Sequence, residues 1–156
     1  MPNGMGKSNV KYLSFIGYPD DAVLENIIDL YTLIFNDADV EFFNTRLKQK
    51  EKSLCAIAYN DNKLIGFKIG YPYNESTFYS WIGGVLPNFR QLGVAAQLAK
   101  LQENYAIENG FSRLKSKSMN KYKPMMVLNL KNGFDITEIY TNAKGQTKIV
   151  FEKKLI

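Results

Sequence analysis

The sequence predicts a single-domain α/β (α+β) protein with a mixed, mostly antiparallel sheet flanked by helices. Three observations support this prediction. The chain has 156 residues, a length that suits one domain. Stretches with apolar residues at helical spacing are interspersed with short stretches rich in β-branched and aromatic residues. Turn residues such as Asn, Asp and Gly separate neighbouring strands, as they do in antiparallel hairpins.

The first part of the chain predicts one strand, two helices and three further strands. Asp20 or Asp21 can cap a helix that reaches about Phe35, because apolar residues follow at helical spacing. A second helix is expected over residues 39–50, with Phe42, Phe43 and Leu47 facing inward. The expected strands are residues 10–16, 54–59, 64–71 and 77–85, with a hairpin turn at 60–63.

The second part predicts a helix, a strand, a shorter helix and a final hairpin. The long helix covers residues 92–108, with Val94, Leu98, Leu101 and Tyr105 on its inner face, and Gly110 ends it. Pro124 suits the first turn of the shorter helix, which ends at Gly133. The strands are residues 112–118, 135–141 and 146–153, so the element order is β-αα-βββ-α-β-α-ββ.

Composition excludes several classes of site. The chain has no histidine, so it cannot build a Ser–His or Cys–His nucleophile pair or a histidine-ligated zinc site, and we expect no metal. Cys55 is the single cysteine, lies within an apolar strand, and is interpreted as core. Residues 1–9 are polar and lack the apolar core of a signal peptide, so we expect a flexible segment followed by a cytoplasmic domain at 10–156, with no membrane partner.

Charge is unevenly distributed along the chain. Up to Val85 there are 8 Lys/Arg and 10 Asp/Glu (8 − 10 = −2), and after it there are 12 and 5 (12 − 5 = +7). A basic part suits a phosphate-bearing partner, either nucleic acid or a phosphorylated cofactor, although a solvated lysine surface explains it equally well. The acidic part holds 14 of the 21 aromatic residues, which suits a pocket for an amine as well as a core.

The segment with the clearest chemical content is residues 85–96, VLPNFRQLGVAA. A strand ends, a loop follows, and a helix begins near Gly93. The first N–H groups of a helix lack intrahelical partners and, with the helix dipole, attract anions. Gly93 and Ala95 let a phosphate approach the backbone, and Arg90 adds a positive charge, although Gly93 could serve only a tight turn.

Val85, Pro87, Arg90, Gly93 and Ala95 form the pattern V-x-P-x-x-R-x-x-G-x-A. This pattern resembles the acyl-CoA signature of the GNAT superfamily of N-acetyltransferases, Q/R-x-x-G-x-G/A, which stands between a strand and a helix. The element order is similar to that family over nearly the whole chain, and Asn120 followed later by Gly133-Phe134 is a second similar feature. The resemblance implies a GNAT-like fold.

The resemblance also implies the reaction and its cosubstrate. Acetyl-CoA would donate its acetyl group to a primary amine, which attacks the thioester directly in a ternary complex. The diphosphate would lie on the amides of residues 91–96, the pantetheine arm would pair with the end of the preceding strand between two splayed strands, and a homodimer would be unsurprising. The implied CoA-binding residues are Gly84, Val85, Leu86, Arg90, Gln91, Leu92, Gly93, Val94, Ala95, Ala96, Asn120 and Asn129.

The sequence departs from the family at the catalytic acid. Many members carry a tyrosine four residues before the glycine of Gly-Phe, where this chain has Asn129, which cannot deliver a proton. Tyr122 is a reserve acid, as is Tyr140, and Glu75 and Glu25 are candidate bases. Tyr79 and Trp81 share a strand face and line either the acceptor pocket or the core.

Three functions remain open at this point. An N-acetyltransferase is favoured, with a small cationic amine slightly preferred as acceptor because the first part of the chain is acidic and aromatic. A non-catalytic acyl-CoA-binding or sensor module is the alternative, since the usual acid is missing. A nucleic-acid partner is not expected, because no DNA- or RNA-binding motif accompanies the basic residues.

Overall fold

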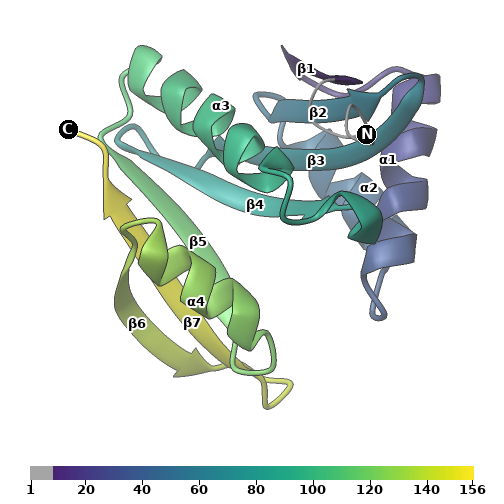
Figure 1. Cartoon of the computed structure of the whole chain (residues 1–156). Helices are drawn as coiled ribbons and strands as arrows, with labels where there is room; N and C mark the ends of the chain where they lie inside the picture. The colour runs from purple at the N-terminus through teal and green to yellow at the C-terminus, as the bar shows by residue number, and fades with distance from the viewer. Residues whose placement is uncertain (1–8) are drawn as a thin grey trace. The chain divides into compact units, whose positions relative to one another are not determined.

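A computed structural model describes residues 9–156 and contains the predicted elements in the predicted order (Figure 1). Residues 1–8 of the expected flexible segment lie outside the described residues. The strands are β1 Val10–Ile16, β2 Leu54–Asn60, β3 Lys63–Pro72, β4 Thr77–Val85, β5 Arg113–Met119, β6 Asp135–Thr141 and β7 Thr147–Lys154. The helices are α1 Asp21–Ile34, α2 Val40–Gln49, α3 Val94–Glu108 and α4 Lys123–Lys131, with a 3₁₀ turn at Pro87–Phe89.

The strands form one seven-stranded sheet in the order β1-β2-β3-β4-β5-β7-β6. The pairs β1–β2, β2–β3, β5–β7 and β6–β7 are antiparallel, whereas β4 and β5 are parallel. The predicted fold class is therefore confirmed. The described residues group into two compact units, one made of the residues from 9 to 71 with Ile82–Asn104 and one made of Pro72–Trp81 with Tyr105–Ile156.

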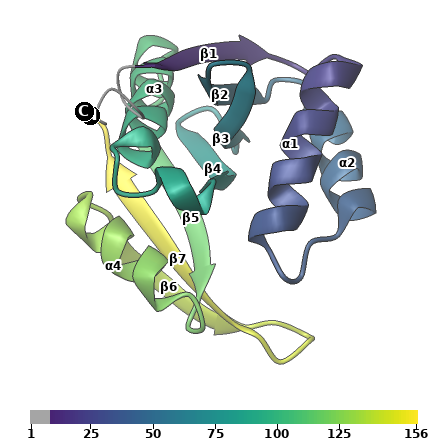
Figure 2. The same ribbon diagram turned by 45° about the vertical axis from the view of Figure 1, so that its right-hand side comes forward.

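In the first unit, α1 and α3 cover opposite faces of the strands (Figure 2). A Cβ added at Gly84 would point at Ile34 of α1, whereas one added at Gly66 would point at Val94 and Leu98 of α3. Asp20 caps α1 as predicted, because its carboxylate accepts the N–H of Val23 at 2.9 Å. The apolar stripe of α1 thus lies on the strands, with Ile27, Leu30 and Tyr31 buried.

Two predicted inner faces need correction. Phe43 and Leu47 of α2 are buried, but Phe42 is 51% exposed and the Arg46 guanidinium lies 4.8 Å from the centre of its ring. Phe42 and Phe43 are one residue apart and point about 100° away from each other around the helix, so only one can face the core. On α3 the fully buried residues follow an i, i+4 line, which includes a glutamine that the apolar pattern did not predict: Val94, Leu98, Gln102 and Ala106.

The second unit is a small sheet with α4 along one face. The strands β5, β7 and β6 lie side by side, and α4 lies over β5 and β7 (Figure 1). Its core contains Leu114 and Phe151, together with Phe78, whose ring makes an edge contact with Phe111 at 5.3 Å between centroids. No helix within residues 9–156 is long and apolar enough to cross a membrane.

Candidate functional site

The backbone between β4 and α3 is built to leave its amides unpaired. Gln91 and Gly93 have positive φ angles of 66° and 83°, which turn the chain sharply twice before the helix. The first bond of α3 runs from the N–H of Gln97 to the carbonyl of Gly93, at 3.0 Å. Within the described residues, no hydrogen bond of good geometry engages the N–H groups of residues 91–96. This end of α3 therefore presents a run of free donors with the positive pole of the helix dipole.

The side chains around these donors keep the site open and positive. Gly93, Ala95 and Ala96 are exposed and small, so nothing shields the backbone from a ligand. Arg90 is exposed as well, and its Nε–H donates to the carbonyl of Val85 at 3.0 Å. That bond holds the guanidinium beside the loop. An anion with several oxygens, such as a diphosphate, matches this arrangement.

The two glycines at the end of β4 lie close to other parts of the protein. A Cβ on Gly83 would lie 2.9 Å from the carbonyl oxygen of Phe67, and one on Gly84 would lie 2.8 Å from Cδ1 of Ile34. Backbone atoms of β3 therefore exclude a side chain at Gly83, whereas a side chain at Gly84 requires Ile34 of α1 to move, whether or not a ligand binds nearby.

The backbone of Leu86 is already engaged. Its N–H donates to the carbonyl of Ile65 at 2.7 Å, and its carbonyl accepts the N–H of Phe89 at 2.8 Å. The carbonyl of Val85 accepts from Arg90. A pantetheine arm that pairs with this part of β4 must therefore use groups other than the N–H of Leu86.

In the second unit, β4 and β5 pair over a short length only. The paired residues are Thr77–Tyr79 with residues 113–115, whereas β5 continues to Met119. The last pair of this ladder joins Tyr79 of β4 to Lys115 of β5. Parallel strands that stop pairing leave backbone groups that an extended ligand can satisfy.

Neither candidate base stands near the end of β4. Glu25 is exposed on α1, roughly 13 Å along the helix axis before Ile34, the residue that faces Gly84. Glu75 is exposed in the turn before β4, where the carboxamide of Asn74 accepts the N–H groups of Ser76 and Thr77, so it lies at the opposite end of that strand from Val85. Along their own elements, both carboxylates therefore lie away from the residues at the end of β4.

The aromatic residues proposed for the acceptor pocket lie in the second unit. Tyr79 is buried and its ring centre is 6.4 Å from that of Tyr73, while Trp81 is half-buried. The ammonium of Lys115 lies 4.1 Å from the centre of the Tyr73 ring. Several other rings also carry one of the chain's own cations, namely Tyr18 with Lys48, Tyr71 with Lys50 and Tyr140 with Lys117. In the acidic, aromatic part of the chain, the rings of Tyr18, Tyr71 and Tyr73 therefore already contact one of the chain's own cations.

The remaining candidates lie on and before α4. Asn120 is exposed, and its carbonyl accepts from Lys123 at 2.6 Å. Tyr122 is the half-buried N-cap residue of α4 and has Lys121 over its ring at 5.2 Å. Asn129 is only 8% exposed, and its Nδ2 has no hydrogen-bond partner among the described residues. Tyr122 stands two turns before Asn129, roughly 10 Å along the helix axis.

Two further polar residues were not singled out from the sequence. The Oγ of Ser118 on β5 is buried and unpartnered within residues 9–156, and its side chain shares a face with Leu114. Strand alternation could have placed Ser118 inward, since Leu114 lies an even number of residues before it. Burial lowers the pKa of Lys68 on β3 to about 8. The sequence signal that could have identified Lys68 as buried is its isolated position within the apolar strand LIGFKIG.

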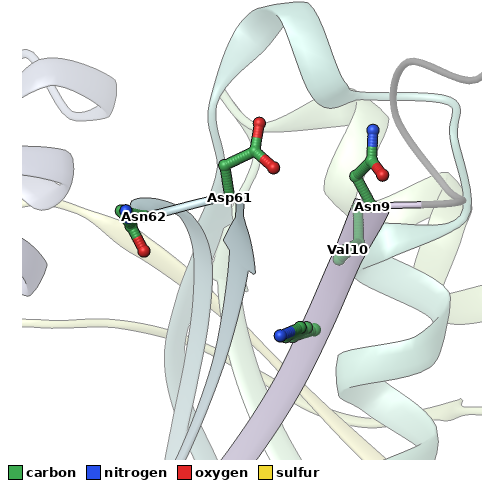
Figure 3. A pocket seen from close by; sticks show the side chains of 5 residues that line it. Asn9, Val10, Asp61 and Asn62 are labelled. Atoms are coloured by element: carbon green, nitrogen blue, oxygen red, sulfur yellow. The ribbon is translucent and has the colours of Figure 1, made fainter.

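A surface hollow elsewhere offers no chemistry of this kind. It lies where β1 begins beside the β2–β3 turn, and Figure 3 shows Asn9, Val10, Asp61 and Asn62 around it, with Lys11 completing the lining. Its single carboxylate and two amides surround an open space. Among residues 9–156 there is also no group of three or more Cys, Asp or Glu side chains that could hold a metal ion.

Comparisons with known proteins agree with the geometry. The family model described as "Acetyltransferase (GNAT) family" matches residues 21–126, whereas no curated protein matches the chain. Among solved structures, a GNAT-family protein from Desulfovibrio desulfuricans is 20% identical, with a TM-score of 0.77 over 94% of this chain and 99% of the other. A GNAT acetyltransferase from Elizabethkingia anophelis with acetyl-CoA bound is 21% identical, with a TM-score of 0.76 over 95% and 99%.

A more distant structural likeness involves an enzyme with a defined acceptor. The ribosomal-protein-S18-alanine N-acetyltransferase of Escherichia coli is 13% identical, with a TM-score of 0.72 over 92% of this chain and 94% of the other. At these identities the structural likeness shows a shared fold.

Proposed function

This chain belongs to the acetyltransferase (GNAT) family, and from that premise we propose that it transfers the acetyl group of acetyl-CoA to a primary amine. Acetyl-CoA is the cosubstrate, and a relative of the same fold carries it in its solved structure. The amine attacks the thioester in a ternary complex, so no acetylated enzyme intermediate is required.

The unpaired amides at the start of α3 support this proposal most strongly. The N–H groups of residues 91–96 would hold the diphosphate of CoA, because they have no acceptor among the described residues. Arg90 would add positive charge at the edge of this site, because its hydrogen bond to the carbonyl of Val85 holds the guanidinium there.

The chain's own groups must then handle one proton from the amine. An alkylamine with a pKa near 10.4 is neutral at pH 7 only at a cost of about 4–5 kcal/mol. Since Glu25 and Glu75 lie far from the end of β4 along their elements, we assign no carboxylate as base. We propose instead that a water molecule accepts this proton, which agrees with the positions of Glu25 and Glu75.

The class of acceptor is proposed only as a primary amine. The preference for a small cationic amine depended on the acidic and aromatic first part of the chain, and the chain's own lysines lie over three of the rings in that part. A panel of polyamines, aminoglycosides and peptides with free α-amino groups, each incubated with acetyl-CoA, would identify the acceptor through thiol release. No observation favours the non-catalytic alternative, which predicts tight CoA binding without thiol release for any amine.

The binding site is tested by calorimetry with a matched pair of variants. Gly93→Asp places bulk and negative charge at the start of α3, and we expect acetyl-CoA affinity to fall at least tenfold. Gly110→Asp is the control, because Gly110 also has a positive φ, of 86°, at the other end of the same helix, and no atom lies within 4 Å of its added Cβ. Equal affinities of the two variants, or no binding of acetyl-CoA to the unaltered protein, would contradict the proposal.

The resemblance makes a homodimer unsurprising, and we include a homodimer in the proposal. Light scattering after size exclusion would show the mass of one or two chains. Parallel runs should be made with and without acetyl-CoA, because a ligand that binds the monomer or the dimer more tightly shifts the population toward that form.

A further inference from the structure

The sheet of the second unit has one face that points away from α4. A Cβ added at Gly133, directly after α4, would lie 3.6 Å from Cε of Lys153, and the β5–β7 ladder pairs Lys153 with the buried Leu114. Residues paired across a ladder share a face, so α4 lies on the face of Leu114. Because side chains alternate along a strand, Arg113 and Lys115 lie on the opposite face, which we call the open face.

Charge is separated across the open face. Its cations come from β5 and β7 and are Arg113, Lys115, Lys117, Lys148 and Lys154. Its carboxylates come from β6 and β7 and are Asp135, Glu138 and Glu152. Among these paired residues the net charge is 5 − 3 = +2, with only cations on β5 and only carboxylates on β6. The guanidinium of Arg113 lies 3.4 Å from the carboxylate of Glu152, so these two charges already compensate each other.

Lys115 and Lys117 are held in place by aromatic rings. The ammonium of Lys115 lies 4.1 Å from the centre of the Tyr73 ring, and that of Lys117 lies 5.5 Å from the centre of the Tyr140 ring. Within residues 9–156, neither ammonium has a carboxylate partner. A ring attracts the ammonium to its face, which limits the motion of the side chain and leaves N–H donors for an anion.

We propose that the open face binds an extended peptide with acidic side chains at alternate positions, and that two of its carboxylates contact Lys115 and Lys117. Residues i and i+2 lie about 7 Å apart in any extended chain, so the two carboxylates and the two lysines of β5 match in spacing. The surface belongs wholly to the second unit. The inference goes beyond the proposed function and does not depend on it.

The carboxylates of β6 favour a peptide over a nucleic acid. Every nucleotide carries a negative phosphate, so a strand that crosses the open face would meet Asp135 and Glu138, which are both exposed. A peptide can place neutral or basic residues at that side. A lysine also occupies one face of each of the Tyr73 and Tyr140 rings, which reduces the surface on which bases could stack.

Fluorescence polarisation without acetyl-CoA tests the inference. The probe is a short labelled peptide in which aspartate and alanine alternate, and its control has asparagine in place of each aspartate. We expect the acidic peptide to bind about tenfold more tightly, as two exposed ion pairs allow, and to lose this advantage as the salt concentration rises. The result is independent of whether the chain transfers an acetyl group.

A pair of charge variants locates the surface. Lys117→Gln should weaken binding of the acidic peptide about threefold, which corresponds to the loss of one exposed ion pair. Lys131→Gln removes the same charge from the exposed end of α4, on the other side of the sheet, and should leave the affinity unchanged.

A second pair tests the role of the ring. Tyr140→Leu removes the aromatic face below Lys117 and should weaken peptide binding about as much as Lys117→Gln. Tyr140→Phe keeps the ring and should bind like the unaltered protein, because the Tyr140 hydroxyl has no hydrogen-bond partner within the described residues. Urea unfolding of each variant shows whether a loss of binding reflects a loss of structure, and Lys117→Gln changes only an exposed side chain.

Three outcomes would overturn the inference. Equal affinities for the acidic and the asparagine peptide would show that the open face does not select carboxylates. Equal losses in Lys117→Gln and Lys131→Gln would show a response to net charge alone. Tighter binding of a single-stranded RNA that carries the same charge as the acidic peptide would assign the surface to nucleic acid.

Discussion

Replacing Gly83 with alanine tests whether β3 and β4 lie as close together as the structure shows. The added Cβ would come within 2.9 Å of the Phe67 carbonyl oxygen, 3.3 Å of Cγ of Lys68 and 3.4 Å of its Cα. Two of these atoms belong to the backbone of a central strand, which cannot move without disturbing its neighbours. Gly84→Ala is the matched comparison, because its nearest atom, at 2.8 Å, is the terminal Cδ1 of Ile34.

The two substitutions should differ by an amount that urea unfolding can resolve. Overpacking against fixed atoms costs about 1–3 kcal/mol, and replacing glycine with alanine returns about 0.4–1 kcal/mol through the unfolded chain. Gly83→Ala should therefore lower the free energy of unfolding by about 1–2 kcal/mol, or roughly 2–8 °C in Tm. At Gly84 a new rotamer of Ile34 costs about 0.5–1.5 kcal/mol, so the net change should lie within about 1 kcal/mol of zero.

The measurement is a pair of urea unfolding curves at 25 °C, with the slope of each transition checked against that of the unaltered protein. An equal decrease in the free energy of unfolding for the two variants, or a larger decrease for Gly84→Ala, would refute the reasoning. That reasoning holds that backbone atoms cannot move away from an added Cβ as easily as the end of a side chain can.

Two further predictions concern stability. Lys68→Met should raise the free energy of unfolding at pH 7 by up to about 3 kcal/mol, because burial lowers the pKa of Lys68 to about 8 and so disfavours the charged form in the folded state. Between about pH 8 and 10.5 the Lys68 amine is protonated in the unfolded chain but neutral in the folded protein. The gain in free energy of unfolding from Lys68→Met should therefore shrink as pH rises through that window. A gain that grows with pH would contradict the prediction. Asp20→Ala removes the carboxylate that accepts the N–H of Val23 and should cost about 1 kcal/mol, measured by urea unfolding, whereas the same change at the neighbouring exposed Asp21 should cost less.

Local rules in the sequence determined the elements and the turn that precedes α3. Asp20 caps α1 and Gly110, with its positive φ, ends α3, because these positions depend on hydrogen bonds within a few residues of chain. The pattern from Val85 to Ala95 likewise placed a glycine at the start of α3, where the structure shows a positive φ at Gly93. Chain-local chemistry is fully visible in a sequence, which explains why these predictions were confirmed.

The tertiary structure alone decided which side chains are enclosed. Phe42 and Phe43 are identical and adjacent, and only the direction in which α2 faces the strands buries one and exposes the other. The same holds for α4, where the strands behind the helix, not its apolar content, select Asn129 for burial. Burial depends on partners far away in the chain, whose contacts follow from the packing of whole elements and leave no local trace in the sequence.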